Sequence, residues 1–402
     1  MLPPVRQAEG KMRLFTPEEL TLRTARFRDR LRGVGVEAAL LSAHSDLFYF
    51  TGSIQRGILI IPAQGDPAYF VRKDIDRARE ETPVTVLPFD PAAIRDHLAT
   101  FKNIGFAADM TTVAEHRLWR EKLVPEGREM PDLSLPLALT KMVKTPVEIA
   151  LMEKAAHINR RAMRQVREIF RPGMRDLDVQ VELEGYARRE LGHQGSFWLR
   201  GSHLEGGLSL VVTGASALEP TYTDFPIGGR GLSPAVAQGA SGEVIGEMFV
   251  VDLIGARDGY NADSTRTFFV GRPDDAIARR YEELRAFLDK MVAFITPGVT
   301  GEEAWNYATA LVTECDWCGW FMGLRSKVRF LGHGIGVEVN QLPVIAAKQA
   351  IPFENGMTIA IEPKIFLPDR GVIGIENTYL MENGRLRSLT GGTETIEETT
   401  IA

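Results

Sequence analysis

Apolar and polar residues follow two different periods along the first 130 residues of the chain. Helical periods alternate with short apolar runs that predict strands at residues 38–42, 57–61 and 68–71. Thr16 and Pro17, with a glutamate three positions after the threonine, form a capping-box pattern that predicts the start of a helix. Alternating helices and strands of this length are typical of a small α/β domain.

The chain is expected to divide near residue 135. The segment 131–136 is flanked by prolines and is predicted to connect two domains, 1–135 and 136–402. Thr145 with Glu148 repeats the capping-box pattern and predicts a long amphipathic helix at the start of the second domain.

The second domain contains a repeated helix–Pro-Gly–helix pattern. One helical stretch runs into Pro172-Gly173 and a second helical stretch follows. About 125 residues later, another helical stretch runs into Pro297-Gly298, and Thr300 caps the next predicted helix. Two such units, each followed by glycine-rich strands, predict a pseudo-twofold αβ duplication with a site between its sheets.

Asp252 and Asp263 belong to two strand-like segments that Asp258-Gly259 separates. Asp-Gly favours a two-residue type I′ turn, which would pair Thr265 with Asp252 and Ile254 with Asp263. The two carboxylates would then be diagonal neighbours on one sheet face, roughly 7–8 Å apart at the backbone. That spacing suits metal ions about 3.5–4 Å apart. A polar outer face on a half-exposed hairpin is the alternative interpretation.

Glu362 and Glu376 each end an apolar run, where a buried carboxylate is costly unless a cation neutralises it. Lys364 is the only basic residue near Glu362. A four-residue loop at 368–371 would place the glutamates on opposite faces. A shared face is therefore expected to need a five-residue loop or a bulge at Pro363.

His333 lies between Gly332 and Gly334, which would let backbone or a ligand approach closely. A single histidine of this kind is more often structural than a ligand. With the four carboxylates, however, it completes an oxygen-rich set with one nitrogen. Such a set suits Mn²⁺, Co²⁺ or Zn²⁺ in a hydrolytic site.

These residues together resemble the metal ligands of metallopeptidase family M24, which includes methionine aminopeptidase, aminopeptidase P and prolidase, and metal-free creatinase. The specific motifs are residues 263–268, 332–336 and 361–363, and residues 46–52 resemble the creatinase-type amino-terminal domain. The resemblance implies a creatinase-type α/β amino-terminal domain followed by an α+β pita-bread catalytic domain with pseudo-twofold symmetry.

The resemblance also implies two divalent metal ions with a bridging hydroxide, Mn²⁺ being the first expectation and Co²⁺ or Zn²⁺ the alternatives. By the family pattern, Asp252 would hold one ion and Asp263 and Glu376 would bridge. His333 and Glu362 would hold the second ion. A homodimer is expected from the resemblance alone.

The sequence departs from the family pattern around the substrate. Asn340 stands seven residues after His333, where a second histidine is usual, and Pro220-Thr221 stands where Pro-His is usual. Gly374 replaces a common arginine, and Lys364 replaces the glycine that normally follows Glu-Pro. The metal ligands therefore look intact while the substrate-binding residues look altered.

The expected activity is hydrolysis of an amide bond in small peptides, with Xaa-Pro dipeptides or an aminopeptidase substrate favoured by the resemblance. Glu362 is expected to act as the general base. Asn340 could donate a hydrogen bond to an oxyanion, and Arg230, in the inserted segment 221–234, is a candidate partner for a substrate carboxylate. The alternatives are a non-peptide C–N hydrolase like creatinase or ectoine hydrolase, and a catalytically silent binding scaffold.

Composition narrows the class of protein further. The chain has 402 residues, is 44% hydrophobic and 25% charged, and carries a net charge of −6 without basic blocks, which argues against nucleic-acid binding. No run of 18 apolar residues predicts a membrane span. The first residues lack an apolar secretion segment, so a cytoplasmic location is expected. Cys315 and Cys318 are the only cysteines and are expected to be reduced thiols.

Overall fold

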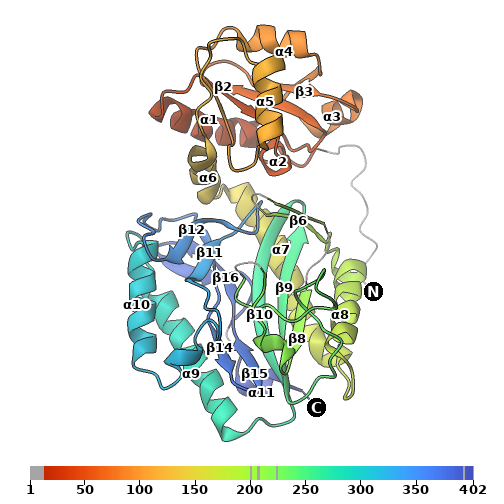
Figure 1. The fold of residues 1–402 in the computed structure, drawn as a ribbon, viewed down its shortest axis with the longest axis vertical. Helices are drawn as coiled ribbons and strands as arrows, with labels where there is room; N and C mark the ends of the chain where they lie inside the picture. The colour runs from red at the N-terminus through yellow and green to blue at the C-terminus, as the bar shows by residue number, and fades with distance from the viewer. Residues whose placement is uncertain (1–12, 200–201, 206–208, 223–224, 393, 402) are drawn as a thin grey trace. The chain divides into compact units, whose positions relative to one another are not determined.

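The computed structural model describes residues 13–199, 202–205, 209–222, 225–392 and 394–401. The chain divides into two compact units, and the change of unit comes between Lys141 and Met142 (Figure 1). The expected division at residue 135 falls at the beginning of helix α6 (Ser134–Met142). Part of the expected connection 131–136 is therefore helical, and Leu133 within it is fully buried. In the described part of the chain, no helix is both long and apolar enough to cross a bilayer.

The first unit is built on a five-stranded sheet with the strand order β4-β3-β2-β1-β5. Its strands are β1 (Ala38–Leu41), β2 (Gly57–Pro62), β3 (Ala68–Val71), β4 (Thr85–Pro88) and β5 (Ile104–Phe106). Its helices, besides α6, are α1 (Pro17–Gly33), α2 (His44–Thr51), α3 (Ile75–Glu81), α4 (Pro91–Leu98) and α5 (Val113–Lys122). Thr16 caps α1 by accepting a hydrogen bond from the Glu19 amide. The three predicted strands and the α/β architecture are thus confirmed.

The second unit contains the two predicted helix pairs. They are α7 (Pro146–Ile169) with α8 (Asp176–Leu191), and α9 (Asp275–Phe294) with α10 (Gly301–Thr313). The turns between the helices place Gly173 and Gly298 at φ of 91° and 95°, where glycine is favoured. Thr145 and Thr300 both form the expected capping boxes. The repeated sequence pattern therefore corresponds to two helix pairs whose turns contain glycines of similar φ.

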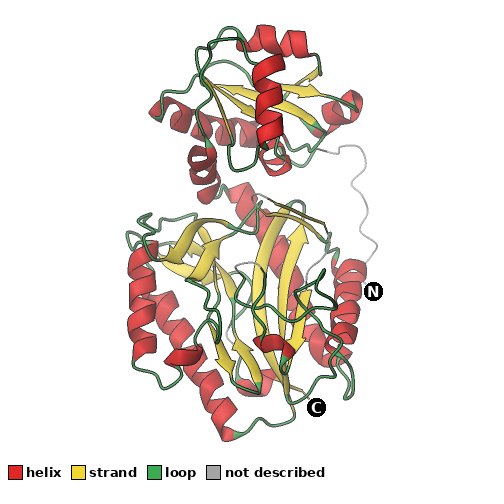
Figure 2. Cartoon of the chain, viewed as in Figure 1, coloured by secondary structure: helices red, strands yellow, loops and turns green. Residues whose placement is uncertain are grey.

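Two larger sheets lie between these helices, as Figure 2 shows. The first has the order β18-β10-β9-β8 and the second has the order β12-β11-β13-β16-β17. The strands of the two sheets are β8 (Ser209–Thr213), β9 (Met248–Arg257), β10 (Tyr260–Val270), β11 (Phe330–Gly334), β12 (Gln341–Ala346), β13 (Thr358–Ile361), β16 (Asn377–Glu382), β17 (Arg385–Ser388) and β18 (Thr400–Ile401). The remaining elements are β6 (Ser196–Leu199), β7 (Ser202–Glu205), β14 (Lys364–Leu367), β15 (Gly371–Gly374), α11 (Ile396–Thr399) and two short 3₁₀ helices, Ser216–Leu218 and Cys318–Trp320.

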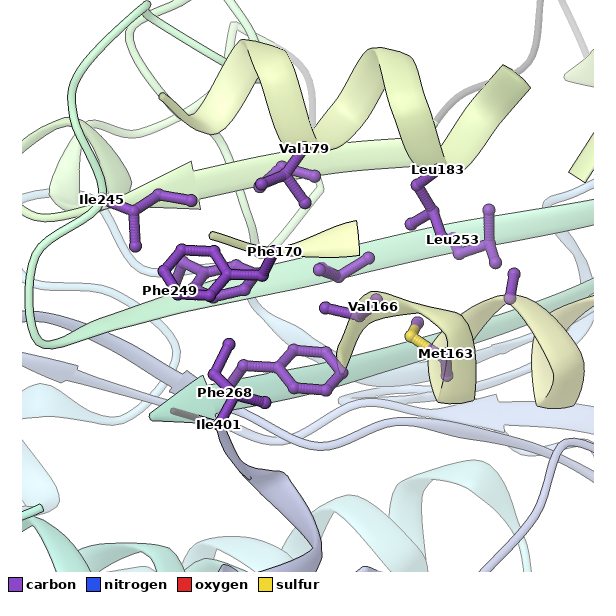
Figure 3. Packing of buried hydrophobic residues seen from close by; sticks show 13 residues of the cluster. Met163, Val166, Phe170, Val179, Leu183, Ile245, Phe249, Leu253, Phe268 and Ile401 are labelled. Atoms are coloured by element: carbon purple, nitrogen blue, oxygen red, sulfur yellow. The ribbon is translucent and has the colours of Figure 1, made fainter. Parts of the chain in front are cut away.

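The first sheet packs its apolar face against α7 and α8. Aromatic rings form the centre of this core: Phe249 stacks between Phe170 and Phe268, each ring centroid 5.4 Å away (Figure 3). Val179 and Leu183 of α8 cover the same cluster. Because this face is filled by side chains, the polar residues of β9 and β10 that alternate with it point to the other side.

The two sheets are joined where β10 meets the strands around residue 376. The Glu376 amide donates to the Thr265 carbonyl at 3.0 Å, and Arg266 forms a bridge with Ile375. The Asp263 amide donates to the Thr378 hydroxyl at 2.8 Å. These bonds fix residues from the two halves of the duplication at one junction, which is where the candidate site lies.

Candidate metal centre

The β9–β10 hairpin places Asp252 and Asp263 as the sequence predicts. The strand register pairs Thr265 with Asp252 and Asp263 with Ile254, and the predicted register is confirmed. The turn residues Asp258 and Gly259 have φ of 52° and 77°, as a type I′ turn requires. The two carboxylates therefore lie on one face of the hairpin, diagonally across the strand pair.

Glu362 and Glu376 face each other directly, but not for the expected reason. The pairs Ile361 with Asn377 and Lys364 with Gly374 share one register, so the two glutamates are opposite each other between them. A three-residue loop closes β14 and β15, so the expected five-residue loop or bulge was wrong. An odd loop length keeps both side chains on one face.

His333 lies on β11, where the strands on both sides approach closely. A Cβ atom added at Gly332 would lie 2.3 Å from the Ala360 carbonyl oxygen, and one at Gly334 would lie 2.1 Å from that of Leu342. The predicted close approach is confirmed, and the approaching atoms belong to the backbone of the neighbouring chain segments. Glycine at these positions lets the two neighbouring strands hold His333 in place.

The ring orientation of His333 leaves one nitrogen available as a ligand. Nδ1 lies 3.1 Å from the Gly334 carbonyl oxygen, which can only accept, so Nδ1 carries the proton. Burial lowers the pKa of His333, which favours the neutral ring. The lone pair of Nε2 is therefore free to bind a metal ion, and it lies 3.6 Å from Glu362 Oε1.

The buried oxygen atoms of the centre fit a divalent ion. Ligand atoms of Asp263, His333 and Glu376 all lie within 4.8 Å of one another. Asp263 Oδ1, Glu362 Oε1 and Glu376 Oε1 are buried and, among the described residues, have no hydrogen-bond partner. Buried carboxylate oxygens without donors are costly, and bound divalent metal would offset this cost.

The crowding of carboxylates shifts their ionisation. Burial, together with the neighbouring Glu376 charge, raises the pKa of Asp263 and of Glu362 well above the ordinary range. The same causes raise the pKa of Asp252 to about 7. Burial opposes the charge of Lys364, but the carboxylates around it outweigh burial and raise its pKa. A positive charge bound at this centre would therefore stabilise the ionised carboxylates.

Two residues of the centre were not predicted as site residues. The Lys364 ammonium donates to Glu376 Oε2 at 3.2 Å, to Glu362 Oε2 at 3.4 Å and to the Thr265 hydroxyl at 3.1 Å. The Thr265 hydroxyl also lies 3.0 Å from Asp252 Oδ1 and 2.6 Å from Glu376 Oε2. The pairing of Thr265 with Asp252 was available from the hairpin register, and Lys364 was noted as the nearest cation.

The two candidate substrate residues lie on the surface. Asn340 is exposed in the loop before β12. Arg230 is exposed and forms ion pairs with Glu243 at 3.5 Å and Glu219 at 3.9 Å. No hydrogen bond or ion pair within the described chain joins either residue to the carboxylates of the centre.

Comparison with known sequences shows which family has this arrangement. The family model for metallopeptidase family M24 matches residues 150–383, more than half of the chain. The chain belongs to metallopeptidase family M24. A second model, for the creatinase/prolidase N-terminal domain, matches residues 23–142. M24 is a family of dinuclear metal enzymes, which agrees with the carboxylate-rich centre.

Several relatives are similar to this chain over nearly its whole length. The Xaa-Pro dipeptidase of Pyrococcus furiosus is 26% identical over 358 residues, covering 88% of this chain and 93% of that protein. The probable dipeptidase PepE of Mycobacterium tuberculosis is 26% identical over 387 residues, covering 92% and 94%. The crystal structure of the prolidase from Pyrococcus horikoshii has a TM-score of 0.76 at 22% identity, covering 92% and 98%. The predicted M24 pita-bread fold is confirmed.

Proposed function

We propose that this M24 metallopeptidase hydrolyses small peptides, acting as an Xaa-Pro dipeptidase or aminopeptidase. The observation that carries the proposal is the convergence of Asp263, His333 and Glu376, whose ligand atoms lie within 4.8 Å of one another on buried strands. The names of the relatives, Xaa-Pro dipeptidase and probable dipeptidase, support this substrate class. Asp252 and Glu362 complete the proposed ligand set.

Residues of the chain and a bound metal ion would have separate roles in hydrolysis. A bound divalent ion would polarise the scissile carbonyl and lower the pKa of water. Glu362 would accept a proton from the attacking water and pass it to the leaving nitrogen. Its pKa is raised by burial, which makes it a stronger base than an exposed glutamate. The Gly334 carbonyl holds the His333 ring so that Nε2 faces the carboxylates.

Asn340 and Arg230 remain our candidates for substrate contacts. Asn340 follows His333 by seven residues and can donate a hydrogen bond to a developing oxyanion. Arg230 could pair with a substrate carboxylate if it exchanges Glu243 and Glu219 for that partner. Both side chains are exposed and so accessible to a ligand.

The remaining expectations are also part of the proposal. Mn²⁺ is the proposed metal, because carboxylate-dominated sites with one imidazole favour harder ions. A cytoplasmic location is supported by Cys315 and Cys318, which are both free thiols. A homodimer that binds neither nucleic acid nor membrane is proposed, and light scattering of the purified protein would test the stoichiometry.

The test is a substrate comparison with added Mn²⁺. Xaa-Pro dipeptides, longer peptides with proline in the second position, cyclic amidines and guanidino acids would be assayed side by side. Release of proline or of the residue before it supports the proposal. The variants Glu362→Ala and His333→Ala would show whether the activity comes from this centre.

A non-peptide C–N hydrolase is the second candidate. The absence of a second histidine at Asn340 favours it, because that change alters the group expected beside the substrate carbonyl. Turnover of a guanidino acid or cyclic amidine, with none of any peptide, would decide for this candidate. A silent scaffold is opposed by the three buried carboxylate oxygens that need a cation.

A further inference from the structure

Lys364 is part of the metal centre, and the centre is built around it. Its side chain is fully buried, and its ammonium lies among Glu376, Glu362 and Thr265 at 3.1–3.4 Å. The amine end of this lysine thus fills the space between two of the proposed metal ligands, Glu362 and Glu376. The protein therefore places a basic side chain of its own where its family binds metal ions.

Gly374 provides the space for this lysine. The two residues are paired across β14 and β15. A Cβ atom at Gly374 would lie 2.6 Å from Lys364 Cδ and 3.2 Å from Lys364 Cε, well inside contact distance. The backbone conformation of Gly374 is not of the left-handed kind that would require glycine by itself. Its missing side chain is explained by the lysine stem that fills the space.

Each of the two glutamates has one oxygen bound to Lys364 and one oxygen without a hydrogen-bond partner among the described residues. Glu362 Oε2 and Glu376 Oε2 accept from Lys364, whereas the Oε1 atoms of both lack a partner among the described residues. Asp263 Oδ1 also lacks one. His333 Nε2 lies 3.6 Å from Glu362 Oε1. Ligand atoms of Asp263, His333 and Glu376 lie within 4.8 Å of one another, and Glu362 adjoins this group through His333.

On the side of Asp252, the Thr265 hydroxyl and the Lys364 ammonium already lie beside the carboxylates. Asp252 Oδ1 accepts from the Thr265 hydroxyl, which in turn contacts the Lys364 ammonium. A second divalent ion that used Glu376 Oε2 would share this oxygen with that ammonium. Two positive groups on one carboxylate oxygen repel each other strongly in a buried site.

We propose that this chain binds a single divalent ion, at Asp263, His333, Glu362 and Glu376, and that the Lys364 ammonium takes the place of the second ion. The inference rests on the proposed function, in which the centre holds metal at all. It departs from the dinuclear pattern of the family and removes Asp252 from the ligand set given under the proposed function. Asp252 is instead assigned a role in holding Thr265 and, through it, the lysine.

The decisive measurement is the number of ions per chain. Metal-free protein would be saturated with Mn²⁺, freed of excess ion, and examined by elemental analysis and native mass spectrometry. One ion per chain is the expected result. Two ions per chain would overturn the inference and leave the proposed function standing. No bound ion would overturn the proposed metal-dependent function as well.

The variant Lys364→Ala tests the cause. It removes the ammonium from both Oε2 atoms and leaves the Thr265 hydroxyl as the neighbour of Glu376 Oε2, so the expected stoichiometry rises to two ions per chain. Lys327→Ala is the matched control, because it removes an exposed lysine outside the centre and should stay at one ion. A folded Lys364→Ala protein that still binds one ion would contradict the role given to the lysine.

A second readout follows the stability of the same variants. Without metal, Lys364→Ala leaves the carboxylates without their cation, so its Tm should fall below that of the wild type. Saturating Mn²⁺ should raise the Tm of the variant by more than it raises that of the wild type. An equal rise in both proteins would speak against the lysine as a substitute for an ion. If the variant does not fold, the wild-type stoichiometry still decides.

Discussion

The contact between Gly374 and Lys364 allows a quantitative test of how the centre is packed. In Gly374→Ala, the new Cβ would meet Lys364 Cδ at 2.6 Å and Thr265 Cγ2 at 3.3 Å. Both neighbours are fully buried, so the lysine stem has to move within a packed interior. Overpacking of this kind costs about 1–3 kcal/mol. Moving the ammonium away from Glu362 and Glu376 would add to that cost.

The assay is a double-mutant cycle on metal-free protein. Calorimetric unfolding would be measured for wild type, Gly374→Ala, Lys364→Ala and the double variant, since calorimetry shows whether the two units unfold in one transition or in two. At roughly 2–4 °C per kcal/mol, the single alanine at 374 should lower the relevant Tm by several degrees. In the Lys364→Ala background, most of this penalty should disappear.

The control for the cycle is Gly246→Ala. A Cβ atom at Gly246 meets nothing within 4 Å, so the same change in chain entropy occurs without a clash. Its Tm should equal or slightly exceed that of the wild type. Two results would refute the reasoning: a Gly374→Ala protein as stable as the wild type, or a penalty that persists undiminished when Lys364 is absent.

Three further predictions concern catalysis, metal and pH. Glu362→Ala and His333→Ala should each lower kcat by orders of magnitude while the calorimetric transitions are retained, and wild-type turnover in either would refute their roles. Removing metal by chelation should abolish peptide hydrolysis, and Mn²⁺ should restore it; activity that survives exhaustive chelation would oppose the proposed function. Burial lowers the pKa of His193 from 6.5 to about 4, so the contribution of the neutral ring to the free energy of unfolding is fully present above pH 6.5 and is lost as the pH falls towards 4. This loss of stability is about 3 kcal/mol. Between pH 6.5 and 4, the Tm of His193→Gln should therefore fall less steeply than that of the wild type, and an equally steep fall in both proteins would contradict the assignment.

Local sequence rules were sufficient to predict half of the centre. Asp258-Gly259 fixes the turn of the β9–β10 hairpin, and the turn alone sets which face Asp252 and Asp263 share. Both conformations that the turn needs are available to aspartate and glycine. The register therefore followed from two residues, without any knowledge of the rest of the fold.

The other half depends on contacts that no local rule contains. The loop after β14 is three residues long because Asp369 takes a φ of 62° and Gly371 a φ of 137°, and a turn of this kind was not evident from the run Pro-Asp-Arg-Gly. The direction of the Lys364 side chain depends on space at Gly374 and on the hydroxyl of Thr265, which come from two other strands. Sequence showed the lysine beside Glu362, but only the assembled strands show where its ammonium lies.

The central claim is that these buried carboxylates and His333 hold a divalent metal ion, and anomalous diffraction from Mn²⁺-loaded crystals tests it most directly. The account predicts a single peak between the side chains of Asp263, His333, Glu362 and Glu376. A map with no anomalous peak between these four side chains would contradict it.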